Sequence, residues 1–299
     1  MRLQEIQNNI SGNLINDGYF TELGHSTVTK RPNLLTFCDN KNFVDLILNN
    51  KNISCVVTTE NLAKEFILRD IGIIVSDNPR FDFFVIHNTT AIKNKKKKTI
   101  IGENLNTSNN CVISKNNVKI GNNCYLEEGV IIRKNVVLGN DVIVRSGSVI
   151  GGQGFQFSKS DNSVLKINHF GNVNIGNNVE IKEFCSIHTA VFNWDETSVG
   201  EDTKIDSHTH IGHGNQIGKR VFICSHANIS GNSIIEDNCY VGPGVNIPNR
   251  LHVGNNVKIS VGSTLTKDVP NNLTVSGHFA ISHDKYIKHI KAISKNTSI

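Results

Sequence analysis

Aliphatic residues recur every six positions through most of the chain. From Ile175 to Leu265 every sixth residue is Ile, Val or Leu, with Asn193 as the one exception. A second series with the same step, displaced by one residue, runs from Ile120 to Ile150. A helix would repeat at 3.6 residues and a simple strand at 2, so this period predicts short strands separated by regular corners. Three such strands close one triangular coil, and the coils must stack to bury their aliphatic residues, which predicts a mainly β solenoid.

Gly and Asn follow the aliphatic positions where the corners are expected. Ile120 is followed by Gly-Asn-Asn, and so are Ile175 and Val253. Both residue types tolerate the left-handed backbone that a tight corner requires. A narrow interior filled by Ile and Val also explains why aromatic residues make up only 6% of the chain.

Three parts of the chain differ in this pattern. Residues 1–98 lack the hexad and alternate short apolar runs with polar ones, which predicts a small α/β domain. Residues 99–278 carry the hexad and form the predicted solenoid domain. Residues 279–299 contain apolar residues at helical spacing, which predicts a C-terminal helix that caps the stack or packs on a neighbouring chain. Lys93 and Lys95 to Lys98 are predicted to lie in the linker between the first two parts.

The hexad is interrupted in two places. It is lost between Ile150 and Val173, and the frame resumes one residue shifted, which predicts a loop that leaves a coil. A shorter departure over residues 191–196 keeps the frame and contains the only tryptophan, so it predicts a bulge or a short loop. We expect both segments to shape a substrate pocket.

Composition narrows the class of protein. Seven cysteines without a C-x-x-C pair argue against a disulfide framework or a zinc site, and Cys124, Cys185 and Cys239 fall on interior positions of the hexad. The chain begins without an apolar signal-like segment and has no run of 18 apolar residues, which predicts a cytoplasmic protein without a membrane span. The net charge of +5 is modest, and we expect no nucleic-acid partner.

Histidine is the residue type that most directly indicates chemistry. His213 lies at a predicted corner between Gly212 and Gly214, where a substrate can approach. A neutral imidazole there can take a proton from an amine or hydroxyl that attacks a thioester. The alternative interpretation is a surface histidine with no chemical task.

A zinc site is a second possibility for the histidines. His208, His210 and His213 carry suitable ligand atoms, but His213 lies past a corner from the other two, so a site would need help from a neighbouring chain. We therefore predict no metal and no permanently bound cofactor.

Taken together, the hexads resemble those of the hexapeptide acyltransferases, which are left-handed parallel β-helix proteins that form trimers with active sites between subunits. Residues 35–43 and 154–157 are similar to segments of the UDP-3-O-acylglucosamine N-acyltransferases of lipid A synthesis, and residues 205–213 resemble the stretch that ends in their catalytic histidine. The late coils, at residues 227–232 and 265–280, are more similar to acetyl-CoA-dependent nucleotide-sugar acetyltransferases. The resemblance implies a homotrimer.

Roles for individual residues follow from this resemblance. It implies that His213 is the general base and that Phe37 and Phe43 stack on the nucleotide base while Asn40 binds its edge. The remaining candidates for binding the substrate and the acyl donor are listed together: Phe155, Gln156 and His208 for the substrate, and Gly231, Arg250 and Lys267 for the donor. Because Gly214 follows His213 where the acetyltransferases often have a carboxylate, the carboxylate partner must come from elsewhere, with Asp206 and Glu196 as candidates.

Two departures from the lipid A enzymes bear on the acyl group. Arg250 stands where those enzymes carry a second active-site histidine, and Thr264 and Thr266 stand where methionines line their acyl groove. Loss of this apolar surface, at about 0.8 kcal/mol per methylene, favours a short acyl group. We therefore expect an N-acyltransferase that moves a short acyl group from acyl-CoA, or from an acyl carrier protein, to the amino group of a UDP- or dTDP-linked amino sugar.

Two alternatives remain open from the sequence. The first is a UDP-3-O-acylglucosamine N-acyltransferase that uses a 3-hydroxyacyl carrier protein, whose acidic surface would suit the Lys-rich C-terminal tail. The second is a trimeric scaffold that keeps the solenoid without the chemistry. Activity with matched donors, and its dependence on His213, distinguishes them.

Overall fold

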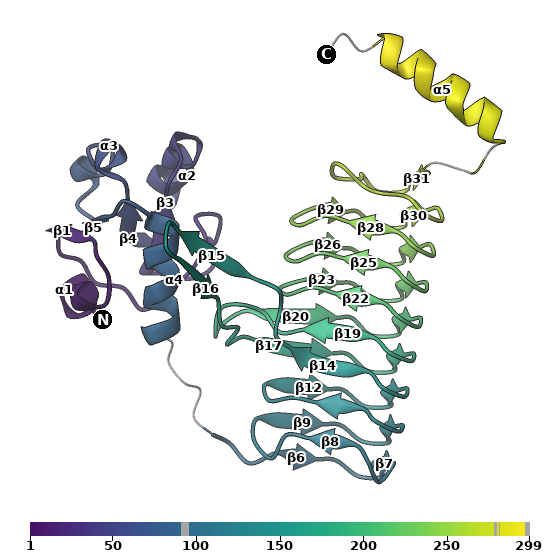
Figure 1. Ribbon diagram of the computed structural model, residues 1–299. Coiled ribbons are helices and arrows are strands. Elements are labelled where there is room, and N and C mark those ends of the chain that lie inside the picture. Colours follow the sequence, from purple (N-terminus) through teal and green to yellow (C-terminus); the bar gives the residue numbers. More distant parts are fainter. Residues whose placement is uncertain (91–95, 278–279, 281, 297–299) are drawn as a thin grey trace.

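Stacked coils form a three-sided prism, and a smaller α/β unit lies beside it (Figure 1). The computed structural model describes residues 1–90, 96–277, 280 and 282–296. Lys93, Lys95 and the predicted boundary at residues 278–279 lie outside the described residues. The remaining linker lysines precede β6 (Ile100–Ile101), so the solenoid begins where the hexad begins.

The walls of the prism are three parallel sheets whose strands are mostly two to four residues long. The nine-stranded sheet contains β7 (Asn106–Thr107), β10 (Tyr125–Leu126), β13 (Ile143–Val144), β18 (Glu180–Ile181), β21 (Lys204–Ile205), β24 (Phe222–Ile223), β27 (Tyr240–Val241), β30 (Lys258–Ile259) and β31 (Thr274–Val275). The seven-stranded sheet contains β8 (Val112–Ile113), β11 (Ile131–Ile132), β14 (Val149–Gly152), β19 (Ser186–His188), β22 (His210–Ile211), β25 (Asn228–Ile229) and β28 (Asn246–Ile247). The eight-stranded sheet contains β6 (Ile100–Ile101), β9 (Val118–Ile120), β12 (Val136–Leu138), β17 (Asn172–Ile175), β20 (Glu196–Val199), β23 (Gln216–Ile217), β26 (Ile234–Ile235) and β29 (His252–Val253).

The predicted aliphatic column is the core of the prism. Its members from Ile175 to Leu265, Asn193 apart, are at most 6% exposed and form one cluster. Cys124, Cys185 and Cys239 are buried in the same cluster, as predicted, and burial raises the pKa of the Cys185 thiol to about 11. The core therefore extends through the whole stack, with no aromatic side chain among its buried members.

Strand register explains both interruptions of the hexad. A regular coil spans 18 residues, as between Val199 and its partner Ile217. Leu138 instead pairs with Ile175, 37 residues later, because an insertion of 19 residues extends outward from a corner of this coil. Ile175 pairs with Val199, 24 residues later, so the second insertion has the length of one hexad. The bulge or short loop predicted over residues 191–196 is confirmed: Asn193 lies inside this insertion, and Val199 occupies the interior position.

The α/β unit is built on a five-stranded sheet with the order β1-β5-β4-β3-β2. Its strands are β1 (Asn13–Asn16), β2 (Glu22–Leu23), β3 (Leu34–Cys38), β4 (Ile53–Thr58) and β5 (Gly72–Val75), and β1 runs antiparallel to β5. Its helices are α1 (Leu3–Ile6), α2 (Val44–Asn49), α3 (Glu60–Ala63) and α4 (Pro79–Thr90), with short 3-10 turns at Gln7–Asn9, Lys41–Phe43 and Ile67–Arg69. The predicted α/β character of this region is confirmed.

The first insertion attaches this unit to the prism. It forms an antiparallel hairpin of β15 (Phe157–Ser160) and β16 (Ser163–Lys166) that lies along α4 (Figure 1). The Asn88 side chain donates to the Lys166 carbonyl over 2.7 Å and accepts from the Asn168 backbone N–H over 3.0 Å. His87 contacts the Asn168 carbonyl over 2.8 Å.

The second insertion makes a further attachment. The Trp194 indole donates to the Leu23 carbonyl over 2.9 Å, and its ring stacks on Phe192 with a centroid distance of 5.6 Å. Phe192 and Val191 belong to the same apolar cluster as the inner face of the α/β sheet. Both insertions thus serve as a platform for the N-terminal unit.

A helix follows the last coil, as predicted. α5 spans His283–Asn296, and its Tyr286 and Ile290 side chains are 50% and 42% exposed in this single chain. None of the helices in the described part of the chain is both long and apolar enough to cross a membrane.

Candidate functional site

One corner of the prism brings together the predicted base and the predicted donor-binding residues. This corner, where the seven-stranded sheet leads into the eight-stranded sheet, is called the His213 corner below. His213 and Gly231 occupy the same position in successive coils, linked by a 2.8 Å hydrogen bond from the Asn232 N–H to the His213 carbonyl. Arg250 lies one coil further on, and its N–H donates to the Gly231 carbonyl over 3.1 Å. Lys267 lies at the same corner in the following coil, between the two residues that pair with β28 and β29 of the preceding coil.

Gly231 makes room for the His213 ring. A Cβ atom at Gly231 would lie 2.6 Å from both Cε1 and Nε2 of the imidazole. Any side chain there would displace the ring, because carbon atoms in contact need about 3.5 Å. The imidazole is therefore packed flat against the backbone of the next coil.

Burial keeps the His213 ring neutral. It lowers the pKa of His213 to about 4, and the positive charges of Arg250 and His210 act in the same direction. An unperturbed histidine side chain has a pKa near 6.5. The structure therefore provides a neutral imidazole over a wider pH range than the sequence indicated.

Three more histidines surround this ring. The His169 ring lies 5.2 Å from that of His213 between centroids, in an edge-on arrangement, and the His188 and His210 rings are 4.6 Å apart on the adjoining wall. Burial is the main cause that lowers the pKa of His169 to about 3 and that of His188 to about 4. A groove of about 420 Å³ runs from Arg133 along this wall to His169.

Asp195 is the carboxylate that lies against the turn carrying His213. Its Oδ2 is 3.6 Å from the position of a Cβ on Gly214, and burial raises its pKa to about 6. Of the two carboxylates suggested by the sequence, Asp206 is at another corner, where it accepts from the Ser207 and Ser225 N–H groups. Within one chain Asp206 is therefore not the partner of His213, and the other candidate, Glu196, lines a groove on the eight-stranded wall.

The N-terminal unit faces the same corner through His25. Burial lowers the pKa of His25 to about 3, and the charges of Arg250 and His213 contribute, so these groups lie within electrostatic range. The His25 ring is 5.3 Å from Phe192 between centroids. Sequence reasoning missed His25, because nothing along the chain indicates that residues near position 25 dock against an insertion near position 192.

The residues expected to bind a nucleotide base lie at one end of the α/β sheet. Phe37 ends up against Phe83, with 5.2 Å between ring centroids, so part of its surface is used in packing. Asn40 accepts from the Asn42 N–H over 2.9 Å and starts the turn that contains Phe43, which is 38% exposed. Phe43 and the amide group of Asn40 thus remain accessible.

Phe155 and Gln156 lie in the first insertion and differ in burial. Phe155 is 92% exposed and contacts Phe157 with 4.9 Å between centroids. The Gln156 Oε1 is buried without a hydrogen-bond partner. The nearby Gly154 N–H donates to the His169 ring, which connects this segment to the histidine cluster.

His208 lies at a different corner from His213. Its ring is stacked between Phe184 and His226, at centroid distances of 5.3 and 5.0 Å. All three residues have positive φ, between 55° and 59°, in positions that other coils fill with Gly. Within one chain His208 does not join the His213 corner, and His208, His210 and His213 do not converge.

Comparison with known proteins identifies the repeat. A family model described as "Bacterial transferase hexapeptide (six repeats)" matches residues 117–152. Residues 117–152 therefore carry hexapeptide repeats of the kind that this family model describes. The UDP-3-O-acylglucosamine N-acyltransferase of Delftia acidovorans is 28% identical over 139 residues, which is 46% of this chain and 41% of that protein. The enzyme with the same name from Methylobacterium sp. (strain 4-46) is 35% identical over 124 residues, which is 42% of this chain and 35% of that protein.

The match thus covers about two fifths of the length of these relatives. Among solved structures, an Arabidopsis UDP-N-acetylglucosamine acyltransferase aligns with a TM-score of 0.50 and 26% identity, over 60% of this chain and 68% of that one. The left-handed parallel β-helix that the resemblance implied is confirmed.

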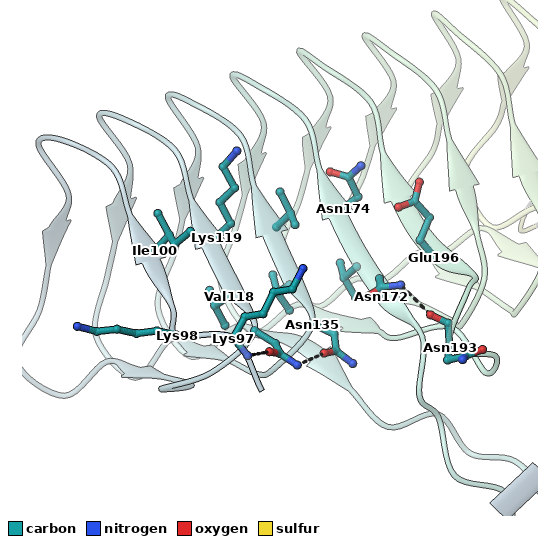
Figure 2. A pocket seen from close by; sticks show the side chains of 14 residues that line it. Lys97, Lys98, Ile100, Val118, Lys119, Asn135, Asn172, Asn174, Asn193 and Glu196 are labelled. Carbon is teal, nitrogen blue, oxygen red and sulfur yellow. Dashed lines mark hydrogen bonds between the residues drawn. The ribbon is translucent and has the colours of Figure 1, made fainter. Parts of the chain in front are cut away.

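The eight-stranded wall carries a groove of about 530 Å³ (Figure 2). Lys119, Asn174 and Glu196 project along it from β9, β17 and β20, and the Asn172 side chain donates to the Asn193 carbonyl over 3.2 Å. The second insertion therefore borders this groove, although its larger side chains pack on the N-terminal unit.

No group of three or more His, Cys, Asp or Glu residues that could hold a metal ion is present in the part of the chain that the structure describes. The histidines of the His213 corner are neutral and close together, but their rings meet edge to face instead of converging on one point. The arrangement suits proton transfer and hydrogen bonding.

Proposed function

We propose that this protein transfers an acyl group from a phosphopantetheine thioester to the amino group of a nucleotide-linked amino sugar at the His213 corner. The observation that carries the proposal is a neutral imidazole packed against Gly231, with Arg250 in the next coil. The names of the curated relatives support a UDP-linked sugar as the acceptor.

In this reaction His213 accepts a proton from the sugar amine while the amine nitrogen attacks the thioester carbonyl. The C–N bond forms, the C–S bond breaks, and the thiolate leaves with a proton returned by the imidazolium. A pKa near 4 keeps the ring free to accept the proton at neutral pH. We assign stabilisation of the developing oxyanion to the Gly231 N–H, on the coil that the ring touches.

The donor is proposed to lie along the later coils. Arg250 and Lys267 are cations at the same corner, which suits the phosphates of coenzyme A or of a carrier-bound phosphopantetheine. Thr264 and Thr266 are exposed on the adjoining coil and offer little apolar surface for a long chain. We therefore favour a short acyl group carried by coenzyme A.

A specific observation favours a second candidate. The Delftia and Methylobacterium relatives are named UDP-3-O-acylglucosamine N-acyltransferases. The competing donor is therefore a 3-hydroxyacyl carrier protein. Both versions share the acceptor site that we assign to Phe37, Asn40 and Phe43 on the N-terminal unit, with Phe155 and Gln156 at the first insertion. In both candidate functions we propose that the protein acts as a homotrimer in the cytoplasm. Within this trimer, His208 of one subunit would complete the site of a neighbouring subunit.

The experiment is a mass-shift assay over a matrix of substrates. The acceptors are UDP- and dTDP-linked amino sugars with and without a 3-O-acyl group, and the donors are acetyl-CoA, 3-hydroxybutyryl-CoA and long-chain 3-hydroxyacyl carrier protein. An acyl-sized mass increase with a short CoA donor supports the first candidate, and one confined to carrier protein and 3-O-acylated sugar supports the second. No transfer with any pair would favour the non-catalytic scaffold.

A further inference from the structure

Two buried ring nitrogens at the His213 corner have no hydrogen-bond partner. Among the described side chains, only five buried nitrogen or oxygen atoms lack a partner, and two of them are His169 Nε2 and His213 Nδ1. They belong to neighbouring rings in an edge-on arrangement, with 5.2 Å between centroids and planes at 72°. Buried polar atoms are rarely left unsatisfied, so this pairing calls for a functional explanation.

His169 is held firmly in place by the first insertion. It is 3% exposed, its backbone N–H donates to Gln153 Oε1 over 2.9 Å, and its carbonyl accepts from Gln153 Nε2 over 3.0 Å. Its Nδ1 lies 3.0 Å from the Gly154 N–H and 3.1 Å from the Thr189 carbonyl. The first contact requires a bare Nδ1 and the second a protonated one, so a neutral His169 satisfies only one of them at a time.

The choice between these contacts determines where the proton of His213 lies. If His169 Nδ1–H donates to Thr189, its bare Nε2 is free to accept from His213 Nδ1–H through one bridging water, since the two nitrogens are not in direct hydrogen-bonding geometry. His213 then keeps a bare Nε2 at Gly231, which is the atom that a general base requires. If His169 Nδ1 instead accepts from Gly154, its Nε2–H donates toward His213 Nδ1 through the same water, and His213 carries its proton on Nε2, where it cannot act as the base.

We propose that His169 is a positioning residue that holds the proton of His213 on Nδ1, with the Thr189 carbonyl as the end of the chain. His169 would thereby do for His213 what a carboxylate often does for a catalytic histidine, at a corner where Gly214 follows the base. The link to catalysis rests on the proposed function, whereas the link between the two rings does not.

The direct test is magic-angle-spinning NMR of sedimented protein labelled with ¹⁵N in histidine, at pH 7.5. Ring ¹⁵N shifts distinguish protonated from bare nitrogens, and a His213→Gln sample identifies the His213 signals. The wild-type protein should show His213 protonated on Nδ1. His169→Phe, which fills the space without hydrogen bonding, should move that proton to Nε2, and His169→Gln, whose amide oxygen can accept, should restore it to Nδ1.

A control separates this pair from the rest of the cluster. His188→Phe removes a ring that meets His210 and not His213, so the His213 tautomer should stay unchanged. A wild-type His213 protonated on Nε2 would overturn the proposal without any variant, which protects the test against misfolding of His169→Phe. A proton that stays on Nδ1 in folded His169→Phe would overturn it as well.

Kinetics supply the second arm once a substrate pair is known. We expect kcat of His169→Phe to fall about 100-fold with KM unchanged, and His169→Gln to recover at least half of this loss on a logarithmic scale. Equal kcat values for His169→Phe and the wild type would contradict the positioning role. If the wild type transfers no acyl group, the proposed function fails, while the tautomer measurement still decides the inference.

Discussion

The contact between the His213 imidazole and the backbone of Gly231 is the basis of the site. His213 and Gly231 are related by one regular coil, so the stacking of the prism alone places the ring against the backbone of the next coil. In a repeat protein, the stacking of each coil on the previous one fixes the relative positions of such residues without further interactions.

Gly231→Ala tests this contact. The new Cβ would lie 2.6 Å from two ring atoms, so the ring must rotate away from its present position. We expect at least a 100-fold loss in kcat with a small change in unfolding temperature, since the overlap involves a half-buried side chain and not the core. Full activity in this variant would show that the ring position is not required.

The sequence predicted His213 and its corner, because the hexad places every residue of a regular coil. Gly231, Arg250 and Lys267 were brought to the same corner for the same reason. His25, His169 and Asp195 could not be found in this way. They reach the site through the α/β unit and the two insertions, whose positions depend on three-dimensional packing and have no periodic signal.

At the scale of elements, the corner that carries His208 shows how side chains adapt to left-handed backbone. Gly129 and Gly147 have φ values of 71° and 72° at this corner, in successive coils. A Cβ at Gly129 would have no contact closer than 3.8 Å, whereas one at Gly147 would lie 2.6 Å from the Phe184 ring.

The two glycines form a matched pair for a stability measurement. Gly129→Ala should lower the free energy of unfolding by about 1 kcal/mol, which is the cost of a left-handed alanine. Gly147→Ala should cost an additional 1–3 kcal/mol, roughly, because it also displaces Phe184. Equal losses in urea unfolding would mean that Phe184 does not pack on this glycine.

The insertions act as docking elements for the N-terminal unit. Trp194 combines a hydrogen bond to Leu23, stacking on Phe192 and a cation over its ring, with Arg31 5.4 Å from the ring centroid. The sequence indicated that two segments leave the prism, but not that both would hold the α/β unit.

Trp194→Ala should therefore loosen that unit and leave the prism intact. We expect a loss of about 3 kcal/mol in the stability of the N-terminal unit, since a large aromatic side chain is removed from a packed contact. Hydrogen exchange should become faster in β3 to β5 and stay unchanged in β21 to β30. Uniform protection in the variant would show that Trp194 does not hold the two parts together.

At the scale of the whole molecule, buried histidines make stability depend on pH. Burial lowers the pKa of His25 and His169 to about 3 and of His188 and His213 to about 4, below the ordinary value of 6.5. The unfolded chain therefore binds more protons than the folded chain between these values and 6.5. Asp195 acts in the opposite sense, because its pKa is raised to about 6 by burial and the folded state takes up its proton first.

Among the described groups, more histidines have a lowered pKa than carboxyls have a raised one, so acidification should destabilise the fold. The contribution of these histidines is complete above pH 6.5 and is lost as the pH falls from there toward 4, at up to about 1.4 kcal/mol per pH unit for each group. Urea unfolding at pH 7.5, 6.5, 5.5 and 5.0 should show this decline. A constant free energy of unfolding between pH 7.5 and 5.0 would contradict the burial of these rings in solution.

A comparison of kcat between variants tests whether His213 is the base of an acyl transfer. With the substrate pair identified by the mass-shift assay, kcat of His213→Gln is compared with that of the wild type and of His252→Ala, a control at an exposed histidine paired with Glu236. We expect kcat to fall about 10²–10⁴-fold for His213→Gln, with the unfolding temperature retained, and to stay unchanged for the control. Wild-type kcat in a folded His213→Gln protein would contradict the role of His213 as the base.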